Sequence, residues 1–373
     1  MEHKIAIIDP VGIKSGMNHY DTFLCTSLDK LGIDTYIYSN FNVKSEAVVS
    51  RLVFGKFFKN KLSQTFNFVK GMFKSCLDCR RNKINMVIIH VFSTHNMAIM
   101  TYAISKFFGL KIITISHDVF SFTDQDNKWY HHLIYNRLSD RIVVHNDYSL
   151  DHLLPQIEPK MHSKVSVIKH GSFIGLPDNS ISRKSARNSL NLDEQRQYIL
   201  FFGRLKPTKR LEVMLRAMTN IDSSIHLIIA GHSGKDDFNK YQFIIDELDL
   251  SSRLVLDINY ITEDKRELYF KAADCLALPY ELIFQSGVLL MSMSYGLPVV
   301  ASQIPSFEEV IENGKNGLLF EKGNAEDLAI KLNTLMNNKD LMSEITKKAI
   351  SHMKSNYCWD SIAKGYVDLI KSI

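Results

Sequence analysis

The sequence is poor in cysteine and lacks any apolar run long enough to cross a membrane. Its five cysteines are scattered and odd in number, which excludes the disulfide framework of a small secreted domain. Cys76 and Cys79 have the spacing of a zinc or redox pair, but no second pair completes a zinc site. The N-terminus also lacks the apolar stretch of a signal peptide. We therefore expect a cytoplasmic protein.

A strong excess of one charge is absent as well. Lysine and arginine number 45 and aspartate and glutamate 40, and the resulting net charge of +5 is too small to indicate a nucleic-acid partner. Asp124 and Asp126 have the bare Asp-x-Asp spacing of a metal site, but they lie in a polar stretch, and we expect neither a metal nor another cofactor. With 373 residues, 45% of them hydrophobic, the chain is long enough for two cores.

Short apolar runs recur in two series along the chain. Runs of this length without alternation fit strands buried on both faces, and stretches with helical periodicity lie between most of them. We therefore predict an α/β fold of two Rossmann-like domains, each with a doubly wound parallel sheet. The predicted strands are Ile5–Ile8, Thr35–Tyr38, Met86–Val91, Ile112–Ile115 and Ile142–Val144 in the first series, and Tyr198–Phe202, Ile225–Ala230, Leu254–Leu256, Cys275–Leu278, Val299–Ala301 and Leu318–Phe320 in the second.

A polar stretch between the two series sets the predicted domain boundaries. Residues 175–191 contain few apolar side chains, and we expect them to connect an N-terminal domain, 1–174, to a C-terminal domain, 192–356. Residues 357–373 have apolar side chains at helical spacing and are expected to form a helix that packs back across the domains. Two such domains would enclose a cleft between their facing strand ends, where parallel sheets bind ligands.

Two segments of the second half indicate an anion site. One predicted strand runs into a basic turn in which Arg204 and Lys209 would converge on a diphosphate, although a solvated basic turn explains this segment equally well. After a later strand, a helix is expected to begin near Ser286 or Gly287, with Ser286 as its cap and Gly287 admitting a ligand close to the backbone. The free amides and positive dipole of this helix would complete the site. The alternative is an ordinary strand, loop and capped helix.

At these residues the chain resembles the retaining GT-B glycosyltransferases, specifically family four, which includes many bacterial polysaccharide and glycolipid enzymes. The resemblance spans nearly the whole chain and is most specific in the C-terminal half. The strong matches are Gly203-Arg204-Leu205 with Lys209, Ala273-Asp274 leading to Pro279-Tyr280, Gln285-Ser286-Gly287-Val288, and Gly296–Ala301. The weaker matches are Ile5–Gly16, His117-Asp118, Ile168–Gly171, Asn313–Phe320 and Cys358–Asp360.

The resemblance implies a reaction. It implies transfer of a sugar from a nucleotide diphosphate donor to a hydroxyl of a saccharide or lipid-linked acceptor, with retention of configuration and without a metal. The pathway would be synthesis of a bacterial-type surface polysaccharide or glycoconjugate.

The resemblance also implies roles for individual residues. His117 would line the sugar site, although a histidine at a strand end is otherwise more often a packing residue, and the Gly16 loop would otherwise be a flexible turn. His145 and His170 are expected to be structural residues bonded to the backbone. The implied contacts of the donor phosphates are Gly16, Arg204, Lys209, Ser286, Gly287 and Val288, those of the donor sugar are His117, Asp118, Glu281 and Gln285, and the catalytic residues are His117, Arg204 and Lys209.

One departure from the family concerns donor recognition. Many members carry two glutamates, near the donor sugar and the nucleotide ribose, at the positions that are Ile283 and Met291 here. The chain instead resembles a subgroup with Pro-Tyr followed, after a short gap, by Gln-Ser-Gly, in which Gln285 or Glu281 would contact the sugar. The missing carboxylates leave a rival interpretation, a non-catalytic sugar-binding or scaffold subunit with the same fold. The retained cations and histidine argue against it.

The most biased region of the chain is Arg51–Lys83, in which Asp78 is the single acid among many cations and phenylalanines. Cations beside aromatic side chains favour peripheral attachment to an anionic membrane, at about 1 kcal/mol per basic group. Such attachment would bring the protein to a lipid-linked acceptor. A solvated basic face over a packed aromatic core explains the same pattern equally well. The residues are Arg51, Lys56, Lys59, Lys61, Lys70, Lys74, Arg80, Arg81 and Lys83, with Phe54, Phe57, Phe58, Phe66, Phe68 and Phe73.

Overall fold

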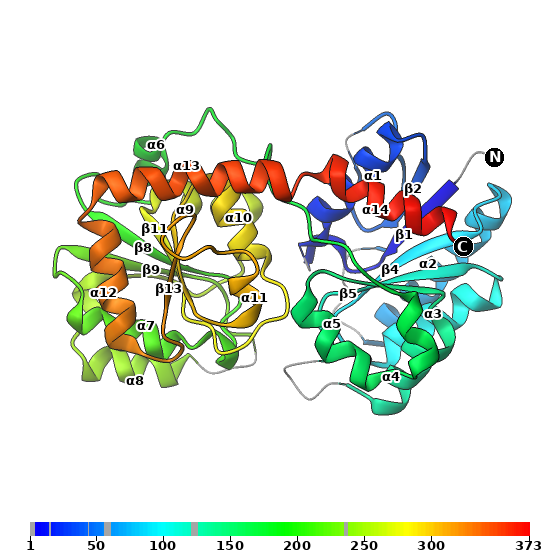
Figure 1. The fold of residues 1–373 in the computed structure, drawn as a ribbon, viewed down its shortest axis with the longest axis horizontal. Helices are drawn as coiled ribbons and strands as arrows, with labels where there is room; N and C mark the ends of the chain where they lie inside the picture. The colour runs from blue at the N-terminus through cyan, green and yellow to red at the C-terminus, as the bar shows by residue number, and fades with distance from the viewer. Residues whose placement is uncertain (1–3, 15, 44, 56–60, 121–125, 235–237) are drawn as a thin grey trace. The chain divides into compact units, whose positions relative to one another are not determined.

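The computed structural model describes residues 4–14, 16–43, 45–55, 61–120, 126–234 and 238–373. The chain divides into two compact units (Figure 1). The first unit consists of Met1–Gly171 together with Tyr357–Ile373, and the second consists of Ser172–Asn356. The chain therefore returns to the first unit for its last helix.

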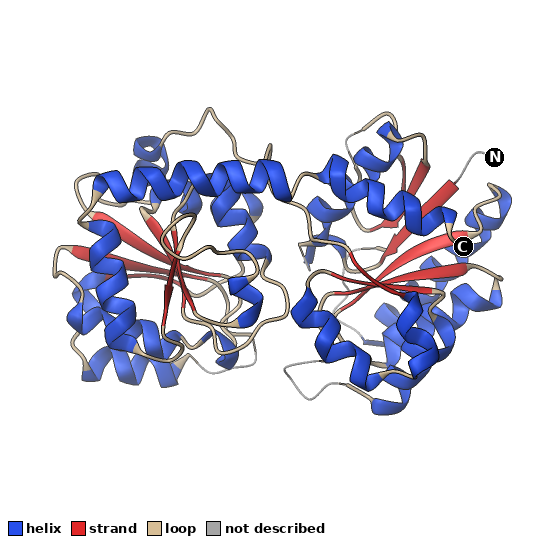
Figure 2. Ribbon diagram, in the orientation of Figure 1, coloured by secondary structure: helices blue, strands red, loops and turns tan. Residues whose placement is uncertain are grey.

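The first unit is built around a parallel 7-stranded sheet of order β3-β2-β1-β4-β5-β6-β7, with helices packed against it (Figure 2). The strands are β1 Lys4–Asp9, β2 Asp34–Ser39, β3 Val49–Leu52, β4 Met86–Val91, β5 Lys111–Ser116, β6 Arg141–Val144 and β7 Val165–Val167. The α-helices are α1 Met17–Lys30, α2 Lys61–Arg81, α3 Asn96–Phe107, α4 Lys128–Leu133, α5 Asp147–Leu153 and α14 Trp359–Lys371.

The second unit repeats this plan with a parallel 6-stranded sheet of order β10-β9-β8-β11-β12-β13. The strands are β8 Gln197–Phe202, β9 Ile225–Ala230, β10 Leu254–Asp257, β11 Cys275–Leu278, β12 Val299–Ser302 and β13 Leu318–Phe320. The α-helices are α6 Arg183–Ser189, α7 Leu211–Ala217, α8 Asn239–Glu247, α9 Glu263–Ala272, α10 Gly287–Tyr295, α11 Pro305–Glu308, α12 Ala325–Met336 and α13 Lys339–Asn356. Among the described residues, no helix combines the length and hydropathy needed to cross a bilayer.

Every strand predicted from the apolar runs is present, and the prediction of two doubly wound parallel sheets is confirmed. The strands missed are β3 and β7, which are short, partly exposed and at the edges of their sheet, so they lack a continuous apolar run. In both sheets the order reverses in the middle, between β1 and β4 in the first and between β8 and β11 in the second. Ligands of doubly wound sheets bind at the carboxyl ends of the strands beside such a reversal.

The predicted helix within residues 357–373 is present as α14, and the chain returns to the first unit at Tyr357, where α14 packs against α1. The hydroxyl groups of Tyr366 on α14 and Tyr20 on α1 are hydrogen-bonded at 2.6 Å. Trp359, at the start of α14, packs so closely on Gly171 that a Cβ at residue 171 would lie 2.0 Å from its ring. The α14 helix is therefore anchored by the buried Trp359 ring, which leaves room only for glycine at position 171.

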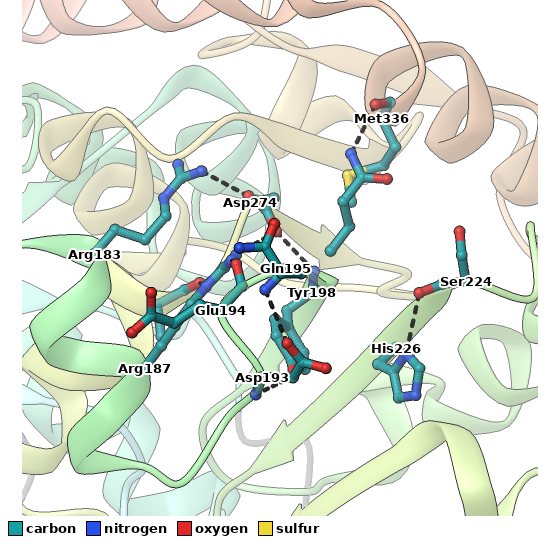
Figure 3. A network of polar contacts seen from close by, with 12 residues as sticks. Arg183, Arg187, Asp193, Glu194, Gln195, Tyr198, Ser224, His226, Asp274 and Met336 are labelled. Carbon is teal, nitrogen blue, oxygen red and sulfur yellow. Dashed lines mark hydrogen bonds and ion pairs between the residues drawn. The ribbon is translucent and has the colours of Figure 1, made fainter.

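The predicted linker, residues 175–191, is wrong in both character and place. This segment lies within the second unit and contains α6. Arg187 of α6 is buried, and its Nη2 donates to Oδ2 of Asp274 at 2.8 Å (Figure 3). The same oxygen accepts the amide of Tyr198 at the start of β8, at 2.7 Å. The segment has few apolar side chains because α6 is held to the second unit largely by this buried ion pair.

We predict that Asp274→Ala destabilises the second unit by about 3–5 kcal/mol, because it leaves the Arg187 guanidinium buried without its counter-ion. Arg183→Ala is the matched control. Arg183 donates to Oδ1 of the same carboxylate at 2.7 Å, but its side chain is 55% exposed, so its loss should cost less than about 1 kcal/mol. Hydrogen exchange of the β8 and β11 amides measures both changes. Equal protection in the two variants would contradict this account.

Candidate functional site

Two loops of the second unit meet where the order of its sheet reverses. The neighbouring strands β8 and β11 continue at their carboxyl ends into residues 203–210 and 279–286. The amide of Glu281 in the second loop donates to the carbonyl of Thr208 in the first, with N and O 2.8 Å apart. The two motifs that the sequence analysis combined into one anion site are therefore joined directly.

Lys209 lies against both loops. Its Nζ donates to the carbonyl oxygen of Phe202 at 3.2 Å and lies 5.0 Å from the centre of the Tyr280 ring. A Cβ on Gly203 would lie 2.9 Å from Nζ, so the position of the amine depends on glycine there. Burial, with a smaller contribution from Lys206, lowers the pKa of the Lys209 ammonium to about 7. No carboxylate among the described residues pairs with it.

Arg204 is exposed in the turn that follows β8. A Cβ on Gly234, in the loop after β9, would lie 3.1 Å from its Nη2. Within the part of the chain that the structure describes, the guanidinium forms no ion pair. The structure thus places Lys209 toward the β11 loop and Arg204 toward the β9 loop, and neither cation has a counter-ion among the described residues.

The α10 helix begins where the sequence predicted, at Gly287 with Ser286 as its cap. The Ser286 Oγ accepts the amide of Leu289 at 3.2 Å. The amides of Gly287 and Val288 have no hydrogen-bond partner among the described residues, which leaves them available to an anion. A Cβ on residue 287 would meet only Phe173, at 4.0 Å, so the space above this glycine is open. The Val288 side chain lies close to the basic turn, since a Cβ on Gly203 would be 3.8 Å from its Cγ2.

Of the second unit's side chains expected to contact the donor sugar, Glu281 forms ion pairs and Gln285 is partly buried. The Glu281 carboxylate forms ion pairs with Arg210, at 3.2 Å from Nε, and with Lys322, at 3.6 Å from Nζ. Gln285 is partly buried in the loop before α10. At the two positions without a carboxylate, Met291 is buried on α10 and Ile283 is partly exposed. The acid of this loop is therefore Glu281, and it is paired with two cations, of which Arg210 also pairs with Glu212 at 3.2 Å.

In the first unit, histidines stand at the carboxyl ends of four neighbouring strands, β4 to β7. The rings of His90, His117, His145 and His170 surround Tyr20, with ring centres 4.9 to 5.7 Å from its own. Burial lowers the pKa of His90 to about 4, of His145 to about 3 and of His170 to about 4. The cluster is therefore neutral at physiological pH.

His117, the residue with the most specific sequence prediction in this unit, lies inside the cluster and is 5% exposed. Its Nε2 lies 2.8 Å from Nδ1 of His90, and its ring stacks on Phe92 with centres 4.5 Å apart. Burial, followed by the neighbouring histidines, lowers the pKa of His117 well below its usual value. Asp118 follows it and is partly buried. His117 is therefore a neutral hydrogen-bonding group rather than a cation.

Gly16 is the N-cap of α1 in the left-handed region, at φ +77°, and no atom of the described residues outside its chain neighbours lies within 4 Å of the place where its Cβ would be. The backbone there is open to a ligand and its conformation favours glycine. The structural histidines were predicted correctly, since Nδ1 of His145 and Nδ1 of His170 donate to the carbonyls of Ile168 and Gly171.

Two other predictions concerned polar or reactive side chains. Asp126 accepts the amide of Thr94 at 2.6 Å, whereas Asp124 lies outside the described residues. Cys76 and Cys79 are buried on α2, and burial raises the pKa of their thiols to about 11 and about 12.

The sequence analysis missed two buried acids of the first unit. Asp9 ends β1, and Asp21 lies fully buried on α1 beside His90. One signal was available for Asp21: at helical spacing it shares the buried face of α1 with Leu24 and Leu28. An acid on the apolar face of a helix needs a buried partner, but the sequence does not show which.

The second unit matches a known family, and the chain has relatives of known type. Residues 182–352 match the family described as Glycosyl transferases group 1. An uncharacterised glycosyltransferase of Methanocaldococcus jannaschii is 27% identical over 187 residues, 50% of this chain and 47% of its own length. A D-inositol 3-phosphate glycosyltransferase of Rhodococcus jostii is 23% identical over 238 residues, 62% of this chain and 52% of its own length. The chain thus spans about half the length of these relatives.

The fold is also shared with a solved structure. The structure of Anabaena HepE in complex with UDP and glucose matches with a TM-score of 0.77 and 17% identity, covering 100% of both chains. At this identity the likeness shows the fold. The chain therefore has the two Rossmann-like units of the GT-B fold, and the match to the glycosyltransferase group 1 family lies within its second unit.

Proposed function

We propose that the protein transfers a sugar from a nucleotide diphosphate sugar to a hydroxyl of a saccharide or lipid-linked acceptor. One observation carries the proposal. Arg204 and Lys209, two cations that form no ion pair with the described residues, lie at the same sheet edge as the amides of Gly287 and Val288, which are unbonded within the same part of the chain. Such a set of donors suits a diphosphate, because it supplies charge and directed hydrogen bonds together.

The same groups could also stabilise the diphosphate as it leaves the sugar. As the bond between sugar and phosphate breaks, negative charge accumulates on the leaving oxygens. Arg204, Lys209 and the amides at the start of α10 would stabilise that charge, a task that a divalent metal performs in other transferases. We therefore propose a reaction that needs no metal. We also propose retention, by same-face attack in which the leaving phosphate helps to deprotonate the acceptor, on the pattern of the family.

The remaining roles follow the sequence prediction. Gly16 would lie against the donor phosphates, because its backbone is open. His117 and Asp118 would contact the donor sugar together with Gln285. Glu281 would act there while paired with Arg210, so its carboxylate would accept sugar hydroxyls without an unpaired charge.

The nucleotide and the pathway are proposed from the relatives. HepE binds UDP and UDP-glucose, and another structure of the same fold is WaaG, a glycosyltransferase involved in lipopolysaccharide biosynthesis. We propose a sugar nucleotide of this kind as donor, in synthesis of a surface polysaccharide or glycoconjugate. Release of nucleoside diphosphate across a panel of sugar nucleotides, with lipid-linked saccharides among the acceptors, tests it.

One observation favours a second candidate, a non-catalytic sugar-binding or scaffold subunit. Ile283 and Met291 occupy positions where many family members carry glutamates, and Met291 is buried. A subunit of this kind would bind nucleotide sugars and release no diphosphate from them. The same panel separates the two candidates.

We also propose that the first unit attaches peripherally to anionic membranes through α2. The structure divides the aromatic side chains of this region: Phe54 and Phe68 are buried, whereas Phe66 and Phe73 are 68% and 44% exposed. The exposed cations of α2 are Lys70, Lys74, Arg80 and Arg81. Lys56, Phe57, Phe58 and Lys59 lie outside the described residues. Exposed phenylalanine and basic side chains on the same helix suit the surface of an anionic bilayer.

Arg204→Ala and Lys209→Met should each lower kcat by about 100-fold, because each removes a donor to the developing charge. Methionine fills the space of the lysine stem against Tyr280. Arg216→Ala, which removes an exposed cation from α7 in the same unit, is the control and should keep normal turnover. Near-normal rates in both site variants would refute the phosphate assignment.

Binding of a nucleoside diphosphate should take up a proton above pH 7. The pKa of Lys209 is lowered to about 7 in the free protein, so the amine is mostly neutral at pH 8, and a bound diphosphate would favour the ammonium. Affinity should therefore fall as the pH rises from about 7 to 9, with no such fall below pH 7. Calorimetry with UDP in buffers of different ionisation enthalpy measures the uptake. Lys209→Met should abolish it, and uptake that persists in this variant would contradict the assignment.

Reversing charge on α2 should weaken membrane binding. The double change Lys70→Glu and Lys74→Glu is expected to lower the affinity for vesicles of phosphatidylcholine with phosphatidylglycerol by about tenfold or more. Lys347→Glu with Lys354→Glu makes the same change of charge on α13 of the second unit and serves as the control. An affinity that is equal in all three proteins removes the membrane proposal.

A further inference from the structure

A buried chain of hydrogen bonds in the first unit ends at His117. Asp21 on α1 is fully buried, and its Oδ1 lies 2.8 Å from Nε2 of His90. The other ring nitrogen of His90, Nδ1, lies 2.8 Å from Nε2 of His117. Asp9, the last residue of β1, is close enough to Asp21 that the two carboxyl groups affect each other's pKa. The hydrogen-bonded chain therefore runs from Asp21 through His90 to His117, with Asp9 beside its first member.

Two neighbouring buried carboxyl groups are most stable when they hold one proton between them. Oδ1 of Asp9 accepts the amides of Val11 and Gly12, at 3.0 and 2.9 Å. Oδ2 of Asp9 and Oδ2 of Asp21 are both buried, and neither has an N–H or O–H donor among the described residues. Burial raises the pKa of both acids, so the pair keeps one proton at neutral pH. That proton is the one donor that these two oxygens can share.

The shared proton decides the direction of every other bond in the chain. Because it is held between the carboxyl groups, Oδ1 of Asp21 accepts from Nε2–H of His90. His90 is neutral, since burial lowers its pKa to about 4, and its Nδ1 is then a lone pair. Nε2 of His117 must therefore donate to His90. His117 is also neutral, so its own Nδ1 carries a lone pair.

The remaining nitrogen of His117 is available to a ligand. Its Nδ1 has no hydrogen-bond partner among the described residues. The ring cannot turn freely, because it stacks on Phe92 with an angle of 9° between the planes and is bonded to His90 at one nitrogen. A fixed ring with one unused lone pair accepts a hydroxyl proton in a defined direction.

We propose that Asp21 and His90 are positioning residues that hold His117 as its Nε2–H tautomer and so present Nδ1 as an acceptor to a hydroxyl of the donor sugar. The identity of the ligand rests on the proposed function, whereas the tautomer rests on the hydrogen-bond chain alone. A sugar nucleotide that lacks the contacted hydroxyl would lose this bond. Recognition here selects for a hydroxyl and against a deoxy position.

Nitrogen NMR of the histidine rings tests the tautomer directly, in the full-length protein labelled with ¹⁵N-histidine. The signals of His117 are those missing from His117→Asn. We expect a protonated Nε2 and an unprotonated Nδ1. The opposite pattern, or shifts averaged between the two tautomers, would overturn the inference. This readout needs no substrate, so it decides the inference even if no sugar nucleotide is turned over, a result that would refute the proposed function instead.

Two variants of His90 separate positioning from a merely structural role. His90→Gln can replace both bonds, since its amide NH₂ donates to Asp21 and its carbonyl accepts from His117, whereas His90→Phe fills the space without either bond. We expect His90→Gln to keep the His117 tautomer and nearly normal turnover. We expect His90→Phe to lower kcat by about tenfold while the affinity for UDP, which lacks the donor sugar, is unchanged.

Loss of the tautomer in His90→Gln, or unchanged His117 signals and turnover in His90→Phe, would overturn the inference. If His90→Phe does not fold, the spectra of the wild-type protein and of His90→Gln still show whether His117 is the Nε2–H tautomer.

Discussion

The reversal of strand order in each parallel sheet is the constraint on which the candidate site depends. At a reversal, the loops after two adjacent strands diverge to opposite faces and leave backbone and side chains exposed at the sheet edge. In the second unit this edge carries the basic turn after β8 and the start of α10, joined by the bond from Glu281 to Thr208. In the first unit it carries Asp9 and His90. The topology alone therefore brings together residues that are far apart in sequence.

The residues at the carboxyl ends of the central strands differ in charge between the two units. In the second, Arg204 and Lys209 have no carboxylate partner among the described residues, and burial, with a smaller contribution from Lys206, lowers the pKa of Lys209. In the first, the described residues of the cluster are four neutral histidines around Tyr20 and two buried acids, Asp9 and Asp21, whose pKa values are raised by burial. One arrangement suits a ligand that brings negative charge, and the other suits a neutral ligand with hydroxyl groups. A sugar nucleotide has both parts.

Sequence reasoning succeeded where a residue's role depends on its neighbours in the chain. Buried parallel strands appear as apolar runs, and the capping of α10 by Ser286 follows from a serine before a glycine and an apolar stretch. It failed where the role depends on a partner from another element. The attachment of α6 needs Arg187 and Asp274 to meet, and the hydrogen-bond chain to His117 needs Asp21 to face β4. Such pairings follow from tertiary packing, which no local pattern shows.

The central claim is that the turn after β8 and the start of α10 hold the diphosphate of a sugar nucleotide. A crystal structure of the protein with UDP bound measures this most directly. The account predicts phosphate oxygens within hydrogen-bond distance of the Lys209 ammonium, the Arg204 guanidinium and the amides of Gly287 and Val288. A diphosphate bound elsewhere, with Lys209 still bonded only to the carbonyl of Phe202, would contradict it.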